Sequence, residues 1–248
     1  MSLPRFFLEP MAWASSTPSL SADEVHHCAE VLRMRVGDGV VVFDGAGRAA
    51  RAVLMQVGRK QVTVQLGEEV PACPERVRIT LAQAIPKGKT MEWIIEKATE
   101  LGVAEIVPLV TDRTIVRLDA EEAVRKQQKW QRVALEACKQ CGQNWLPSVR
   151  LPQSLESWLA EGELPEFRLI GALTADARPL QTWIKSKGEG VRSACLLVGP
   201  EGDFSRQEMT MALAARFHPL AMGPIVLRAE TAAIFGLSIL TYELNAGK

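Results

Sequence analysis

Two segments near the carboxyl end of this sequence share an order of residue types that suits the binding of a ligand. Residues 193–205 and 222–232 each place Gly-Pro and a short loop, preceded by apolar residues, before a predicted helix. Glycine permits backbone angles that other residues resist and proline ends strand pairing, so backbone polar groups are left free. Loops of this kind at the carboxyl ends of buried strands would form a crevice for a flat polar ligand such as an adenine nucleoside. Two ordinary strand-to-helix turns would explain the same pattern, and both interpretations stay open.

The second segment also carries two charged side chains that could take part in catalysis. Glu230 is its carboxylate and could act as a general base. Arg228 cannot be a base because a guanidinium stays protonated, but it could stabilise a developing anion. The alternative is structural: Glu230 would cap a helix and Arg228 would form an ion pair with it.

The elements that must position these residues are two strands and two helices. Residues 194–198 are apolar without alternation, which is typical of a strand buried on both faces. Ser205 and Glu208 have the spacing of a capping box, so a helix is predicted to begin there. After Thr231 an apolar stripe with helical spacing predicts the last helix; it contains Ile234, Leu237, Leu240 and Leu244.

The preceding residues, from 73 onwards, also alternate between strand and helix patterns. Strands are predicted at 77–84, 106–110, 148–151, 167–173 and 220–222, and helices at 91–101, with Gly102 as its left-handed cap, and 120–142. This alternation predicts an α/β domain, residues 73–248, with a parallel sheet covered on both faces.

Residues 1–72 follow a different pattern. Residues 21–34 are predicted to form a short helix with Ser21 and Glu24 as a capping box. From Gly37 the apolar residues recur with a period of two, in short runs separated by turns. This indicates a small β-barrel, joined to the α/β domain by the linker Pro71-Ala-Cys-Pro74.

Composition excludes several classes of protein. The 248 residues carry 29 basic and 29 acidic side chains, so no global positive charge indicates a nucleic-acid partner, and RNA contact would depend on local patches. No stretch approaches the roughly 20 apolar residues of a membrane span. The five cysteines are irregularly spaced, which indicates reduced thiols and a cytoplasmic protein. A lone pair, Cys138 and Cys141, lacks the further ligands of a metal site, so these cysteines are interpreted as packing residues.

Several basic side chains are candidates for contact with RNA phosphates. Lys87 and Lys89 precede a predicted helix in a loop that ends Gly-Lys-Thr; Gln83 stands where a phosphate-binding P-loop needs glycine, which argues against an NTPase. The other candidates are Arg5, Arg33, Arg35 and Arg113, for each of which a solvated surface position is the alternative.

The two loop segments resemble those of a known family. Gly199-Pro200-Glu201-Gly202-x-Phe204-Ser205, followed by Met222-Gly223-Pro224-x-Val226-Leu227-Arg228-x-Glu230-Thr231-Ala232, is similar to the RsmE family of SPOUT-class methyltransferases, which modify N3 of a uridine in small-subunit ribosomal RNA. The resemblance extends over nearly the whole chain, through 31–38, 83–88 and 96–102. It departs from the family pattern at Asp203, where glycine is usual, and at Ile225, where arginine is usual.

The resemblance implies a fold, a cofactor and partners. Residues 1–72 would form a PUA-like RNA-binding β-barrel, and residues 73–248 a SPOUT domain with a trefoil knot at its carboxyl end, pairing as a homodimer. S-adenosylmethionine would bind without a metal, in a shell formed by Leu197, Gly199, Glu201, Gly202, Met222, Gly223, Ile225 and Leu227.

The implied substrate is 16S ribosomal RNA, free or in the small subunit, with the target uridine unpaired or extruded. Glu230 would accept the N3 proton and Arg228 would stabilise the uracil anion at O2 or O4. The departures at Asp203 and Ile225 keep a second hypothesis open, an RNA-binding ribosome-assembly factor that has lost catalysis. A third hypothesis is a methyltransferase acting on the ribose 2′-hydroxyl.

Overall fold

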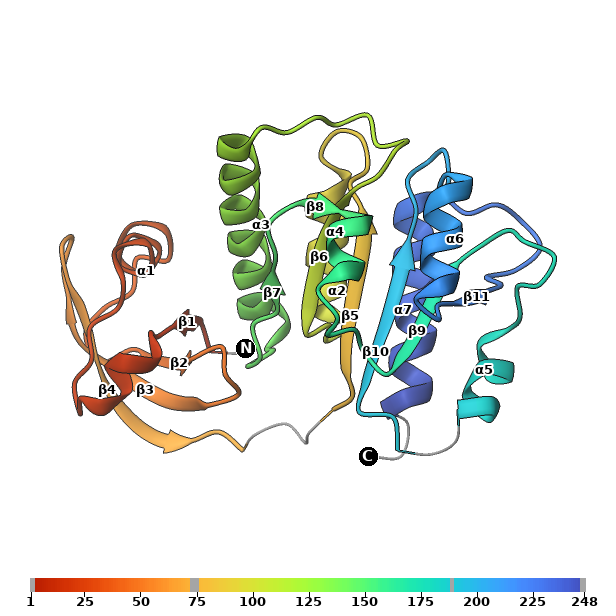
Figure 1. Ribbon diagram of the computed structural model, residues 1–248. Helices are drawn as coiled ribbons and strands as arrows, with labels where there is room; N and C mark the ends of the chain where they lie inside the picture. Colours follow the sequence, from red (N-terminus) through yellow and green to blue (C-terminus); the bar gives the residue numbers. More distant parts are fainter. Residues whose placement is uncertain (1–2, 72–75, 188–189, 246–248) are drawn as a thin grey trace. The chain divides into compact units, whose positions relative to one another are not determined.

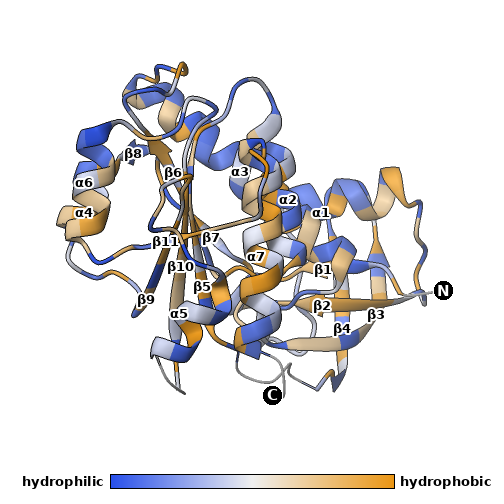
Figure 2. Cartoon of the chain, turned by 90° about the vertical axis from the view of Figure 1, so that its right-hand side faces the viewer, coloured by the Kyte–Doolittle hydropathy of each residue, from blue (hydrophilic) through white to orange (hydrophobic). Residues whose placement is uncertain are grey.

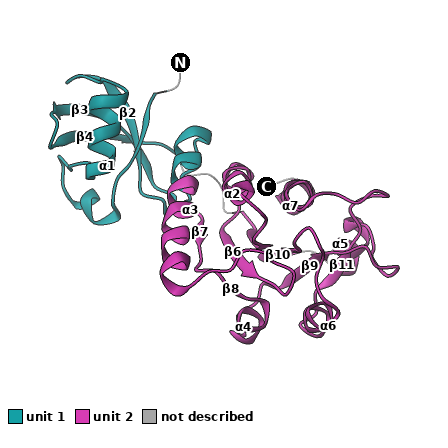
Figure 3. Ribbon diagram, turned by 90° about the horizontal axis from the view of Figure 1, so that it is seen from above, with its two compact units in different colours: residues 1–74, 135–146 teal, residues 75–134, 147–248 magenta. Residues whose placement is uncertain are grey.

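The chain folds into two compact units, coloured separately in Figure 3. The computed structural model describes residues 3–71, 76–187 and 190–245. Unit 1 comprises residues 1–74 and 135–146, and unit 2 comprises residues 75–134 and 147–248. The boundary expected between residues 72 and 73, and all of the expected linker except Pro71, lie outside the described residues. The sequence did not predict that residues 135–146 pack with the first unit.

Unit 1 is built on a small four-stranded sheet. Its strands are β1 (Arg5–Phe7), β2 (Gly39–Phe43), β3 (Ala49–Val57) and β4 (Val62–Glu69), in the order β1-β2-β3-β4. The β1–β2 pair is parallel and the other two pairs are antiparallel, as expected for strands joined by short turns. The alternating pattern predicted this meander because every second side chain of β3, including Ala52 and Leu54, enters the core.

Short helices cover this sheet, and one sequence prediction about them is wrong. After the 3₁₀ turn η1 (Pro10–Ala14) the chain forms α1 (Ala22–His26), which continues as the π-helical turn η2 (His27–Val31). Ser21 does precede α1, but its side chain makes no capping hydrogen bond. Glu24 is buried instead and forms an ion pair with Lys139, so a tertiary partner has taken the carboxylate that the capping box required.

Residues 135–146 complete unit 1. The side chain of Lys139 joins Glu24 to Glu136, and Arg5 donates from Nη2 to Asn144 Oδ1 over 2.5 Å. The indole of Trp145 lies against Gly47, where an added Cβ would come within 2.4 Å of a ring carbon. Contacts of this kind link residues far apart in the chain, so no local sequence pattern could predict them.

Unit 2 contains a seven-stranded parallel sheet, as the strand and helix alternation predicted (Figure 1). Six of its strands follow the order β11-β9-β10-β5-β6-β7, and β8 pairs with β6. Every pair in it is parallel. The strands are β5 (Arg78–Ala84), β6 (Glu105–Val110), β7 (Ser148–Val149), β8 (Gln153–Ser154), β9 (Phe167–Gly171), β10 (Ser193–Val198) and β11 (His218–Leu220).

Helices cover both faces of this sheet. The helices α2 (Thr90–Glu100) and α7 (Ala229–Asn245) lie together on one face, and α4 (Leu155–Ala160) and α6 (Arg206–Ala214) on the other (Figure 3). The remaining helices are α3 (Ala120–Cys141), whose last residues belong to unit 1, and α5 (Leu180–Lys187). The strands are hydrophobic along most of their length and the helices are mixed (Figure 2), as expected when only the sheet is enclosed on both sides. Among the described residues, no helix combines the length and apolar character needed to cross a membrane.

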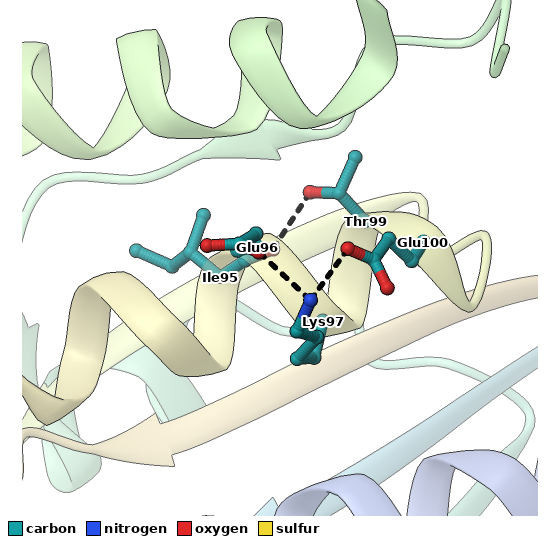
Figure 4. A network of polar contacts seen from close by, with 5 residues as sticks. All are labelled: Ile95, Glu96, Lys97, Thr99 and Glu100. Atoms are coloured by element: carbon teal, nitrogen blue, oxygen red, sulfur yellow. Dashed lines mark hydrogen bonds and ion pairs between the residues drawn. The ribbon is translucent and has the colours of Figure 1, made fainter. Parts of the chain in front are cut away.

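The last turn of α2 shows how one stretch of family resemblance serves the fold. Lys97 Nζ donates to Glu96 Oε1 over 2.8 Å and to Glu100 Oε1 over 2.7 Å (Figure 4). These hydrogen bonds, that to Glu100 first, raise the pKa of Lys97 to about 12. The hydroxyl of buried Thr99 donates to Ile95 O, and Gly102 adopts the left-handed conformation predicted for it, with φ +79°. The motif therefore ends a helix, and its charged residues form contacts within that helix.

Candidate functional site

Three neighbouring strands of unit 2 end at one cavity of about 280 Å³. β9, β10 and β11 are adjacent and parallel, so their carboxyl ends lie at the same edge of the sheet. The volume is near the lower end of the range for small-molecule sites. The lining comes from the ends of these strands, both Gly-Pro loops and the first turn of α7: Gly171, Ala172, Leu173, Val198, Gly199, Pro200, Glu201, Asp203, Leu220, Met222, Gly223, Ile225, Val226, Leu227, Arg228, Ala229 and Ala232.

The loop after β10, residues 199–205, is held in place by hydrogen bonds, and we refer to it as the braced loop. The Asp203 N–H donates to Pro200 O over 2.9 Å and closes a turn. Glu201 Oε1 accepts from the backbone N–H of Lys87 over 3.2 Å, and Gly202 O accepts from Arg113 Nη1 over 2.5 Å. The braced loop is therefore tied to the loops that follow β5 and β6.

The capping box predicted at the start of α6 is confirmed. Ser205 Oγ accepts from the Glu208 N–H over 3.3 Å, and Glu208 Oε2 accepts from the Ser205 N–H over 2.8 Å. Glu208 is buried, and its Oε1 also accepts from the Asp112 N–H over 2.9 Å. One carboxylate thus fixes both the braced loop and the segment after β6.

The loop after β11, residues 221–228, is mostly exposed, and we refer to it as the open loop. Ile225 and Val226 are 69% and 76% exposed although they line the cavity. The loop is anchored at its start by Met222, whose Cε lies 2.8 Å from a Cβ built on Gly171 and 3.2 Å from one built on Gly236. Glycines from β9 and α7 therefore make room for the Met222 side chain.

The structure brings most of the residues predicted to contact a cofactor to this cavity. Gly199 and Glu201 line it from the braced loop, and Met222, Gly223, Ile225 and Leu227 line it from the open loop. Leu197 and Gly202 are not among the lining residues. The side chain of Leu197 belongs to the hydrophobic core on the α4 and α6 face, because neighbouring residues of a strand point to opposite faces. Gly202 lies beside Arg113.

The two predicted catalytic residues occupy different positions. Arg228 is exposed and lines the cavity, whereas Glu230 is half-buried in the first turn of α7 and does not line it. Among the ion pairs of the described residues there is none between Arg228 and Glu230, which was the structural alternative. The guanidinium is therefore available to a ligand in the cavity.

The two departures from the family pattern both lie at the cavity. Asp203 has φ +62°, a left-handed conformation in which glycine is least strained and aspartate is better tolerated than most residues. Aspartate at this position therefore adds a side chain where glycine is usual, while the backbone can still form the turn. Ile225 lines the cavity and is 69% exposed, so most of its side chain is in contact with solvent.

Three of the basic residues predicted to contact RNA lie around the same sheet edge. Lys87 and Lys89 are exposed on the loop before α2, and Arg113 is exposed on the segment after β6. Because Lys87 and Arg113 contact the braced loop directly, both are neighbours of the cavity wall.

The other three basic residues belong to unit 1. Arg33 and Arg35 are exposed. Arg5 is half-buried, stacks over the Phe43 ring at 4.8 Å and donates to Asn144. Much of its hydrogen-bonding capacity therefore serves the fold of unit 1.

Three of the described cysteines, Cys28, Cys138 and Cys195, are buried, whereas Cys141 is exposed, so its interpretation as a packing residue is wrong. Cys195 is buried within β10, and burial raises the pKa of its thiol. Burial likewise raises the pKa of Cys138 to about 12, so this thiol stays protonated, and its Sγ lies 3.7 Å from Trp145 O. Within the part of the chain that the structure describes, no three His, Cys, Asp or Glu side chains are grouped as metal ligands.

Sequence reasoning missed the contribution of β9 to the site. Gly171, Ala172 and Leu173 form one wall of the cavity at the end of this strand. The available signal was weak: residues 167–173 were predicted as a strand, but no Gly-Pro pair follows them. Only the strand order, with β9 between β10 and β11, places this end beside both loops.

Comparison with known protein families identifies the class of protein to which this chain belongs. Residues 73–241 match the model of the RNA methyltransferase domain, and residues 20–67 match the model of the RNA methyltransferase PUA domain. A Synechocystis protein named ribosomal RNA small subunit methyltransferase E is 32% identical over 98% of this chain and 77% of its own length. The chain is an RNA methyltransferase and belongs to the family of ribosomal RNA small subunit methyltransferase E, or RsmE.

Solved structures show the same fold. A Legionella pneumophila protein, solved with bound S-adenosylmethionine, has 33% identity and a TM-score of 0.88, and 98% of each chain is covered. The ribosomal RNA small subunit methyltransferase E of Neisseria gonorrhoeae, also bound to S-adenosylmethionine, has 31% identity and a TM-score of 0.86, covering 97% of this chain and 98% of its own. The expected fold class, a small β domain followed by a SPOUT-type α/β domain, is therefore confirmed.

Proposed function

We propose that this protein is a cytoplasmic enzyme that transfers a methyl group from S-adenosylmethionine to N3 of a specific uridine in 16S ribosomal RNA. The observation that carries the proposal is the cavity that the two Gly-Pro loops and the end of β9 line together. Two relatives of the same fold were solved with this cofactor bound. Family membership supports the class of substrate, and the trefoil knot expected from the resemblance remains part of the proposal.

The cavity suits an adenosine with a charged tail. Leu173, Val198 and Val226 offer apolar surface for a flat ring, while the backbone of Gly199 and Gly223 can approach a ligand closely. Charged groups line the same cavity, Glu201 and Asp203 from the braced loop and Arg228 from the open loop. When bound, the cofactor would supply an electrophilic methyl group and a positively charged sulfur.

The chain's own residues would prepare the uracil. Its N3 loses a proton only in alkaline solution, so the site must favour the anion. Arg228 lines the cavity and would stabilise the negative charge that develops on O2 or O4. Glu230, two residues further on, would accept the N3 proton. Its half-buried position outside the cavity lining requires the RNA to approach from the side of α7.

The basic residues beside the braced loop would hold the RNA backbone. Lys87 and Lys89 near the start of α2, together with Arg113, would contact phosphates and position the substrate without reading its sequence. We also propose a homodimer, supported by exposed apolar side chains on the open loop and α7, namely Ile225, Val226, Phe235 and Tyr242.

The test is methylation of small-subunit ribosomal RNA followed by mass spectrometry of the nucleosides. We expect a methylated uridine whose methyl group stays with the base after glycosidic cleavage. A methyl group that stays with the sugar would instead identify a ribose 2′-hydroxyl methyltransferase. Absence of S-adenosylmethionine binding in calorimetry at millimolar ligand would favour an RNA-binding assembly factor without catalysis.

A further inference from the structure

Asp203 keeps a charged side chain where the backbone favours glycine. Its φ is +62°, and its N–H closes the turn of the braced loop onto Pro200 O. Among the described non-glycine residues, only Arg33 and Arg216 share a positive φ. Non-glycine residues held in this backbone conformation cluster at functional sites.

The carboxylate of Asp203 is held at the cavity wall. Its Oδ1 accepts from the Phe204 N–H over 2.8 Å, and the same oxygen lies 3.5 Å from a Cβ built on Gly199. Gly199 and Asp203 both line the cavity. The negative charge therefore lies against the backbone that the proposed cofactor would contact.

The other charges at the cavity differ from Asp203 in their surroundings. Glu201 directs Oε1 to the backbone N–H of Lys87, and Arg228 is exposed on the open loop. The side chain of Asp203 is partly buried and bonds within its own loop, so water screens its charge less than that of an exposed carboxylate.

We propose that Asp203 is a specificity-determining residue that favours the positively charged methyl donor over its neutral product. This inference rests on the function proposed above. When the methyl carbon bonds to N3 of the uracil, its bond to sulfur breaks and the electron pair stays on sulfur, so the sulfonium becomes an uncharged sulfide. The attraction between sulfur and carboxylate exists only before transfer. Asp203 therefore strengthens binding of S-adenosylmethionine and leaves S-adenosylhomocysteine free to depart.

The test is calorimetry of both ligands with the full-length protein and with Asp203→Asn. Asparagine has the same size, tolerates a positive φ and can still accept from the Phe204 N–H, so it removes little besides the charge. We expect the preference for S-adenosylmethionine over S-adenosylhomocysteine to fall about fivefold, through weaker binding of the donor alone. Asp203→Gly should give the same fall in preference and serves as a second variant in which the turn is unstrained.

A matched control is Asp112→Asn, which removes one negative charge from an exposed residue that does not line the cavity. Its preference between the two ligands should equal that of the unmodified protein. An unchanged preference in both Asp203 variants, or an equal loss of affinity for both ligands, would overturn the inference and leave the proposed function standing. Failure of the unmodified protein to bind S-adenosylmethionine would overturn the proposed function and this inference with it.

Discussion

The two Gly-Pro loops look alike in sequence and differ in structure. The braced loop is fixed by its own turn, by Glu208 and by contacts to Lys87 and Arg113. The open loop is anchored at Met222 and exposes Ile225 and Val226 to solvent. Both line the same cavity, so one wall is preformed and the other has few internal restraints among the described residues.

This difference suggests that the two loops have different roles in binding and catalysis. A preformed wall binds a ligand at low entropic cost, because its backbone groups are already oriented. A less restrained wall can adapt to a second, larger substrate, and it carries Arg228. We infer that the braced loop chiefly sets the affinity for the cofactor, and the open loop chiefly sets turnover on RNA.

The largest effect is expected from Arg228→Ala in the open loop. Loss of a group that stabilises the developing anion should lower the turnover number at least about 100-fold. The thermal midpoint should not change, since Arg228 is exposed. Transfer of a labelled methyl group to ribosomal RNA measures the turnover number, and calorimetric unfolding measures the thermal midpoint. Arg228→Lys is the control that keeps the charge, and turnover near normal in Arg228→Ala would remove this residue from the mechanism.

Substitution of the glutamate that follows each loop should affect the stability of the protein to different degrees. Glu208→Ala leaves the N–H groups of Ser205 and Asp112 without their acceptor and should lower the free energy of unfolding by about 2–3 kcal/mol. The corresponding Glu230→Ala at the start of α7 should cost less than about 0.5 kcal/mol, as other surface changes do. Urea unfolding of both variants measures the difference.

The same two variants should also differ in turnover. Glu230→Ala should lower turnover about 100-fold if Glu230 takes the proton. Equal losses of stability in the two variants would contradict the contrast between the loops.

The basic residues beside the braced loop should act on affinity for RNA. Lys89→Ala removes one proposed phosphate contact, so the slope of log affinity against log salt concentration should fall by about 0.7 for a single-stranded substrate. Lys185→Ala, on the exposed surface of α5, is the matched control and should leave the slope unchanged. Binding isotherms at several salt concentrations measure both. An unaltered slope in Lys89→Ala would place the RNA elsewhere.

The smallest effect is expected from Asp203→Gly in the braced loop. Relief of the left-handed backbone is worth about 1 kcal/mol, and the greater freedom of glycine in the unfolded chain offsets about half of it. Glycine also lacks the side-chain oxygen that accepts from the Phe204 N–H, a loss of about 0.5 kcal/mol, so the free energy of unfolding and the urea midpoint should stay nearly unchanged. Asp203→Ala should instead destabilise the protein, because alanine loses the same hydrogen bond and keeps the strained left-handed backbone. A loss of stability in Asp203→Gly would show that this hydrogen bond outweighs the strain.

Much of unit 2 could be predicted because its signals are local. The apolar run at 194–198 became β10, the capping box at Ser205 formed as expected, and Gly102 ended α2. Local patterns failed where a distant residue intervened. Glu24 has the spacing of a capping box with Ser21 but pairs with Lys139, which lies more than a hundred residues away in the chain.

The candidate site shows the same limit. The two Gly-Pro segments could be singled out because glycine and proline act on the backbone where they stand. Leu197 was predicted to lie in a strand buried on both faces, but the sequence could not tell that its side chain faces α4 and α6, since that depends on which face of β10 each helix covers. Gly171 and Gly236, which make room for Met222, carried no signal at all.

The sequence by itself determined the succession of strands and helices, the two loops and the family to which the chain belongs. These properties follow from backbone preferences and side-chain periodicity, which act over a few residues. Only the tertiary structure decided that β9 lies between β10 and β11, that residues 135–146 pack with unit 1, and that one Gly-Pro loop is braced and the other open. Strand order and packing depend on contacts between residues far apart in the chain. The free energy of such contacts cannot be judged from a short stretch of sequence.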